Sequence, residues 1–67
     1  MNPRLLTVDD VAELFGVPKS WIYERTRIRG EEQIPHLKLG RYIRFEEAAV
    51  SDYLDRQRKA YLSRPVT

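Results

Sequence analysis

A single glycine, Gly16, separates two stretches in which apolar residues recur at helical spacing. The first stretch covers residues 7–15 and the second covers residues 18–29. Because glycine readily adopts the left-handed conformation that ends a helix, this spacing predicts two short helices joined by a tight turn. Helices joined by so few residues cannot lie antiparallel, so we expect them to cross at a steep angle.

The first helix carries signals at both ends. The Thr7 hydroxyl can cap its first turn, and the carboxylates of Asp9 and Asp10 suit the positive end of the helix dipole. Gly16 then ends the helix. One face is predicted to be core, and it consists of Val8, Val11, Ala12 and Phe15, with Leu14 beside it.

The second helix has an apolar side and a polar side. Pro18 fits its first turn, where a missing N–H costs nothing. The residues that recur at helical spacing toward the core are Trp21, Ile22, Arg25 and Ile28. The predicted outer face carries Lys19, Ser20, Tyr23, Glu24 and Arg27.

Residues 36–45, HLKLGRYIRF, alternate apolar with basic side chains. This alternation predicts a two-stranded hairpin with Gly40 and Arg41 at its tip, preceded by a loop over residues 29–35. A lone hairpin is not stable in water, so its apolar face must pack on the helices. We expect Leu37, Leu39, Ile43 and Phe45 to face the core and Lys38, Tyr42 and Arg44 to face outward.

A third helix is predicted to begin at Glu46. Its apolar stripe, which should close the core over the hairpin, consists of Val50, Tyr53, Leu54, Gln57 and Tyr61. The fold class is therefore mainly α with a small β-hairpin, in the order α-α-β-β-α. We expect one domain over residues 1–62 and a flexible C-terminal tail over residues 63–67.

Composition narrows the classes of function. The 67 residues include no cysteine and one histidine, so we expect no metal site and no pairing of a nucleophile with a base. A chain this short has a small core with little room for a substrate pocket. We therefore expect neither enzyme activity nor a cofactor. No apolar run is long enough to span a membrane, and we expect a soluble, cytoplasmic protein.

Positive charge is concentrated in the middle of the chain. The net charge is only +2, but residues 18–44 carry seven basic and three acidic side chains. This asymmetry attracts a polyanion such as nucleic acid, although chance clustering explains the charge alone equally well. The spacing of residues is a second indication of nucleic-acid binding. A helix-turn-helix needs a small residue where its helices touch, a turn, and apolar residues that hold the second helix on the first. This chain has Ala12, Gly16, and then Val17 and Ile22 at these positions.

Two segments, LLTVDDVAELFGVPKSWIYE and IPHLKLGRYIRFEEAAVSDYL, resemble the excisionase and MerR-like winged helix-turn-helix proteins. The resemblance covers about residues 5–55 and implies binding to double-stranded DNA. The second helix would enter the major groove, and the hairpin, or wing, would lie along the backbone or in the adjacent minor groove. The resemblance assigns two sets of DNA contacts. The helix contacts are Lys19, Ser20, Tyr23, Glu24 and Arg27, and the wing contacts are Lys38, Arg41 and Arg44.

The most specific function that this resemblance implies is that of an excisionase, a recombination directionality factor. Such a protein would bind beside an integrase as side-by-side copies on nucleoid DNA of a bacterial host, and would favour excision of a prophage or mobile element. A small phage or plasmid transcriptional regulator with the same fold is the first alternative. A protein-interaction module that uses Tyr53, Tyr61 and the C-terminal helix is the second.

Some residues of the outer helical face have a second interpretation. Lys19 and Arg27 can be solvated without touching DNA, although their exposed positions favour contact. Glu24 can accept from a cytosine amino group or form an intrahelical ion pair with Lys19 or Arg27. Tyr23 lacks an obvious packing partner, which favours DNA contact.

Four further residues are open to interpretation. Trp21 shares the face of Ile28, so a core position is the preferred interpretation. The alternative is a wedge that stacks on a DNA base. Arg25 and Arg29 either bind phosphates or lie over apolar neighbours. His36 is interpreted as a surface residue of a strand, without a metal or catalytic partner.

Overall fold

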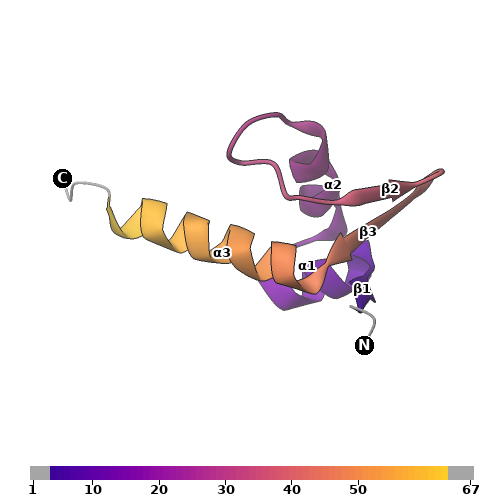
Figure 1. Ribbon diagram of the computed structural model, residues 1–67, viewed down its shortest axis with the longest axis horizontal. Coiled ribbons are helices and arrows are strands. Elements are labelled where there is room, and N and C mark those ends of the chain that lie inside the picture. Colours follow the sequence, from indigo (N-terminus) through magenta and orange to yellow (C-terminus); the bar gives the residue numbers. More distant parts are fainter. Residues whose placement is uncertain (1–3, 64–67) are drawn as a thin grey trace.

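The computed structural model describes residues 4–63 and confirms the predicted order of elements (Figure 1). The helices are α1 (Val8–Phe15), α2 (Lys19–Arg27) and α3 (Glu47–Leu62), and the strands are β1 (Leu5–Leu6), β2 (Leu37–Leu39) and β3 (Tyr42–Glu46). Strand β1 is an addition to the prediction, because two residues are too few to show an alternating pattern. It extends the hairpin to a three-stranded antiparallel sheet in the order β1-β3-β2.

Helix α1 begins and ends where its sequence predicts. The Thr7 hydroxyl accepts a hydrogen bond from the backbone N–H of Asp10 at 3.1 Å, and the Asp10 carboxylate accepts one from the backbone N–H of Thr7 at 3.0 Å. This reciprocal pair is a capping box. Gly16 has a φ of 71° and donates its N–H to the carbonyl of Ala12 at 2.8 Å, so the chain leaves the helix there.

Helix α2 ends earlier than its apolar spacing predicts. Pro18 is the N-cap, and the last helical residue is Arg27. Ile28 lies beyond the helix in an extended conformation, with φ of −74° and ψ of 158°. The buried side of the helix is formed by Ile22 and Thr26, and the Thr26 hydroxyl donates to the carbonyl of Tyr23 at 2.7 Å.

The register of the hairpin corrects the predicted faces of the wing. Leu37 pairs with Arg44, Lys38 with Ile43, and Leu39 with Tyr42. Directly opposed residues of an antiparallel pair project to the same face. The inner face, toward the helices, therefore carries Lys38, Ile43 and Phe45, and the outer face carries Leu37, Leu39, Tyr42 and Arg44. The prediction that all four apolar residues of the hairpin face the core is wrong, because a turn of only two residues aligns Leu39 with Tyr42.

Exposure follows this register. Leu39 and Leu37 are 51% and 38% exposed, whereas Phe45 is 0% exposed. The core consists of Leu6, Val8, Val11, Ala12, Ile22, Ile34, Phe45, Val50 and Tyr53. Ile34 is fully buried although it lies in the segment that the sequence predicts to be a loop.

Helix α3 contributes buried apolar side chains to the core from its first half, within the residues that the structure describes. Val50 and Tyr53 are buried, and the later turns extend away from the other elements (Figure 1). Tyr61, which the stripe predicts to be packed, is 72% exposed. The reason is geometric, since the 16-residue helix is longer than the surface that the two short helices and the sheet offer.

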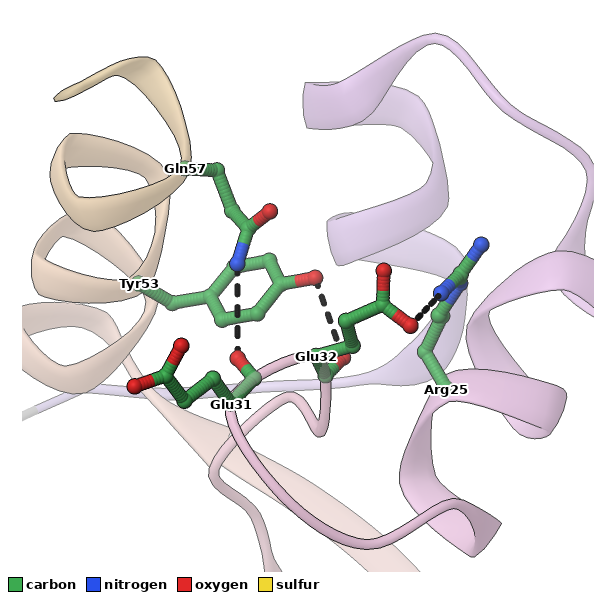
Figure 2. Close-up of polar contacts among 5 residues, drawn as sticks. All are labelled: Arg25, Glu31, Glu32, Tyr53 and Gln57. Atoms are coloured by element: carbon green, nitrogen blue, oxygen red, sulfur yellow. Dashed lines mark hydrogen bonds and ion pairs between the residues drawn. The ribbon is translucent and has the colours of Figure 1, made fainter. Parts of the chain in front are cut away.

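The segment between α2 and β2 is tied to α3 and α2 by polar contacts (Figure 2). Tyr53 donates its hydroxyl to the carbonyl of Glu32 at 3.2 Å, and Gln57 donates its amide to the carbonyl of Glu31 at 3.3 Å. Arg25 of α2 forms an ion pair with the Glu32 carboxylate at 3.4 Å. These contacts connect α2 and α3 through the segment between α2 and β2.

The predicted tail at residues 63–67 lies almost entirely outside the described residues. Ser63 is the C-cap of α3, and its hydroxyl donates to the carbonyl of Lys59 at 2.8 Å. Within residues 4–63 no helix is long and apolar enough to cross a membrane.

Candidate nucleic-acid interface

The outer face of α2 is exposed along its whole length. Ile22 and Thr26 turn toward the core, whereas the exposed side chains are Lys19, Ser20, Tyr23, Glu24 and Arg27. All five residues assigned to this face by the sequence therefore lie where a bound duplex can reach them. A helix exposed in this way fits the width of the major groove, where base edges offer distinct patterns of donors and acceptors.

The intrahelical ion pair of Glu24 with Lys19 or Arg27, one of the two interpretations of Glu24, is not found within residues 4–63. Lys19 forms its ion pair with Asp9 of α1 at 3.3 Å, which bridges the two helices of the turn. Among residues 4–63 Glu24 takes part in no ion pair. Its carboxylate is therefore left to accept from a partner outside the chain, as the contact with a cytosine amino group requires.

A groove of about 350 Å³ separates α2 from the inner face of the wing. We call it the α2–wing groove; it is lined by Tyr23, Thr26, Arg27, His36, Lys38, Arg41 and Ile43. No carboxylate lines it, and Arg27, Lys38 and Arg41 form no ion pair within residues 4–63. A groove lined by three cations and no carboxylate among residues 4–63 favours an anion over a cation, and phosphate is the anion that DNA presents.

A second groove, of about 290 Å³, lies on the other side of Tyr23 and Arg41. It runs from the start of α1 to the wing and is lined by Thr7, Val8, Asp9, Tyr23, Arg41, Tyr42, Ile43 and Arg44. Asp9 lies at this groove, but its charge is offset by the ion pair with Lys19. Tyr23, Arg41 and Ile43 line both grooves.

At the tip of the wing two arginine side chains lie over one aromatic ring. Gly40 has a φ of 65°, which suits the first position of a two-residue turn, and Arg41 occupies the second. The guanidinium groups of Arg41 and Arg44 lie 5.8 Å and 5.5 Å from the centre of the Tyr42 ring. Arg44 also donates to the carbonyl of Ile43 at 2.8 Å. Stacking on one aromatic ring limits the positions that the two cations can occupy.

The structure distinguishes the three additional candidates. Trp21 is half-buried and meets the Phe15 ring edge-on, with ring centres 6.4 Å apart. The Arg25 guanidinium lies 4.6 Å from the centre of the Trp21 ring and is also paired with Glu32. Trp21 and Arg25 therefore have packing roles, as their core and apolar-neighbour interpretations expect. Arg29 is exposed in the segment after α2.

The sequence did not predict that His36 lines the α2–wing groove. The alternation of the wing places it at the same face as Lys38, and a correct register would have directed both toward α2. Its Nδ1 lies 2.9 Å from the carbonyl oxygen of Ile34. Within residues 4–63 no group of three or more metal-ligating side chains is found.

Two helices joined by a glycine turn, with a basic hairpin beside the exposed face of the second, define a winged helix-turn-helix. A profile of the helix-turn-helix domain family matches residues 5–58, and the chain belongs to this family, which includes excisionase-like proteins. DNA binding is the activity that this membership supports. A comparison with curated proteins gave no significant match, and a comparison with solved structures gave none either.

Proposed function

We propose that this protein is an excisionase, a DNA-binding directionality factor that works with an integrase to favour excision of a mobile element or prophage. It acts by binding and arranging DNA and catalyses no step of strand exchange itself. The α2–wing groove supports DNA binding most strongly, because, among the residues that the structure describes, it is lined by three cations without an ion-pair partner and by no carboxylate. The resemblance of the wing sequence to excisionases supports the more specific role.

The proposed binding mode uses two kinds of contact. Arg27, Lys38 and Arg41 bind backbone phosphates and provide affinity that falls with salt concentration. The side chains of Tyr23 and Glu24 on α2 read base edges in the major groove and provide sequence preference. A duplex that touches both α2 and the wing tip covers a continuous surface, because the two elements border the same grooves.

One copy of so small a domain makes few phosphate contacts, so we propose that side-by-side copies bind together. Large apolar side chains remain exposed on the outer face of the wing, at Leu39 and Tyr42, and at the end of α3, at Tyr61 and Leu62. Exposed apolar groups of this size support contact with another protein, whether a second copy or the integrase.

Excision by the cognate integrase, measured with and without this protein, tests the proposal. The proposal predicts that excision rises when the protein is present and that integration does not. Unchanged recombination together with altered activity of a nearby promoter would contradict it and identify a transcriptional regulator. A mixture of single-site and double-site duplexes tests the assembly: the proposal predicts tighter, cooperative binding to the double site.

A further inference from the structure

His36 lies at the α2–wing groove with one ring nitrogen already engaged. Its Nδ1 is 2.9 Å from the carbonyl oxygen of Ile34. Because a carbonyl oxygen can only accept, Nδ1 carries a hydrogen and donates it. In the neutral ring Nε2 then has a lone pair and no hydrogen, and within residues 4–63 no hydrogen bond to Nε2 is found.

Two core residues hold the imidazole in place. Ile34, whose carbonyl receives the Nδ1 hydrogen, is 0% exposed, and so is Phe45. The Phe45 ring lies 6.4 Å from the His36 ring, centre to centre, at an angle of 55°. A side chain fixed on both sides loses little conformational entropy when it binds a ligand.

The groups that surround His36 in the groove are cationic or neutral. Arg27 lines the groove from α2, Lys38 from β2 and Arg41 from the turn, and among residues 4–63 the one other titratable lining group is the phenol of Tyr23. No carboxylate is available there to stabilise an imidazolium ion. An anion that entered the groove would provide the missing negative charge and favour the protonated ring.

We propose that His36 is a protonation-linked ligand for a DNA backbone phosphate in the α2–wing groove. The inference rests on the proposed DNA binding and adds a residue and a pH dependence to it. Protonated at Nε2, His36 donates to a phosphate oxygen while Nδ1 keeps its bond to Ile34. The neutral ring has no donor left for the phosphate, so binding takes up a proton from solvent and tightens as the pH falls.

The test is the affinity for a short duplex of mixed sequence at pH 6 and at pH 8, in phosphate-free buffer of constant ionic strength. Mixed sequence suffices because a phosphate contact does not depend on the bases. The wild-type protein should bind roughly three- to tenfold more tightly at pH 6, the gain expected from one charge-assisted hydrogen bond. Thermal melts at both pH values check that the fold is unchanged.

Two variants separate the role of His36 from general effects. His36→Asn keeps a donor for the Ile34 carbonyl but cannot gain a charge, so it should bind like the wild type at pH 8 and lose the gain at pH 6. Lys38→Met removes a permanent cation and should weaken binding at both pH values while it keeps the gain.

The outcomes distinguish this inference from the proposed function. An equal pH dependence in the wild type and in folded His36→Asn overturns the role of His36 and leaves DNA binding standing. Failure of the wild type to bind duplex DNA at low salt at either pH overturns the proposed function and this inference together.

Discussion

Tyr23 of α2 and Arg41 of the wing tip border the same two grooves. One residue comes from the helix that would enter the major groove, and the other from the turn that would follow the backbone. Their shared position joins the two predicted DNA-binding elements into one surface. Changes at either residue should therefore affect the same binding event.

Replacing Arg41 by alanine should weaken binding to duplex DNA at every sequence. Arg41 is exposed at the wing tip and forms no ion pair within residues 4–63, so its loss removes a phosphate contact and, inside the protein, the contact with the Tyr42 ring. The slope of log affinity against log salt should become shallower by about 0.9, the contribution of one phosphate contact to duplex DNA. Fluorescence anisotropy at several salt concentrations measures this slope.

Arg58→Ala is the matched control for this prediction. Arg58 is also an exposed arginine, but it lies on α3 and pairs with Asp55 at 3.6 Å. Its removal should leave the salt slope unchanged. Equal losses of slope in the two variants would mean that net charge, and not the position of the wing, determines binding.

The register of the wing predicts unequal effects of two apolar substitutions. Phe45→Ala should destabilise the fold by about 3–5 kcal/mol, because it creates a cavity in the core. Leu39→Ser should change the stability by no more than about 0.5 kcal/mol, because Leu39 lies on the outer face and is 51% exposed. Urea denaturation measures both. A large loss in Leu39→Ser would instead support a wing in which Leu39 faces the core.

Asp10 should give the protein a stability that depends on acid pH. Hydrogen bonds from the backbone N–H and then from the side chain of Thr7 lower the pKa of the Asp10 carboxyl below its ordinary value of 3.8. A lowered pKa in the folded state stabilises the fold above the unfolded value, and this contribution is lost as the pH falls through the folded value. Thermal melts of the wild type and Asp10→Asn should therefore differ at neutral pH and converge below pH 3.8. A difference in thermal stability that persists in strong acid would show that Asp10 stabilises the fold through packing and not through its charge.

Tyr53→Phe should destabilise the fold by about 1 kcal/mol, because it removes the hydrogen bond to the Glu32 carbonyl. Burial also raises the pKa of the Tyr53 phenol above its ordinary value of 10.0. A raised pKa in the folded state gives a stability that is complete below the unfolded value and is lost as the pH rises through the folded value. Urea denaturation from neutral pH to above pH 10 should show the wild type losing its advantage over Tyr53→Phe only at the alkaline end. A constant advantage would contradict this.

The helical part of the fold could be predicted because its signals are local. Thr7 and Gly16 mark the two ends of α1 by their own hydrogen-bonding and conformational preferences, and the structure places both where the sequence indicates. The exposed face of α2 follows from the period of the helix. Each of these features depends on residues no more than four positions apart.

The features that could not be predicted depend on distant partners. Ile34 is buried because the segment after α2 folds back on the core. The glycine and proline of this segment indicate a loop, and no local pattern in the sequence indicates that one of its residues is buried. β1 exists only because Leu6 pairs with Phe45, far along the chain. The face of Leu39 was within reach of the sequence, since a two-residue turn requires it to pair with Tyr42, but alternation alone does not include that constraint.

A titration of isotope-labelled protein with a short duplex, followed by NMR, tests directly whether α2 and the wing together bind duplex DNA. We expect the largest shifts in amide and side-chain signals at Lys19, Tyr23, Arg27, Lys38 and Arg41. Signals from the exposed end of α3, at Tyr61 and Leu62, should move little on a duplex with room for one copy. Shifts concentrated on α3, with α2 and the wing unaffected, would contradict this expectation.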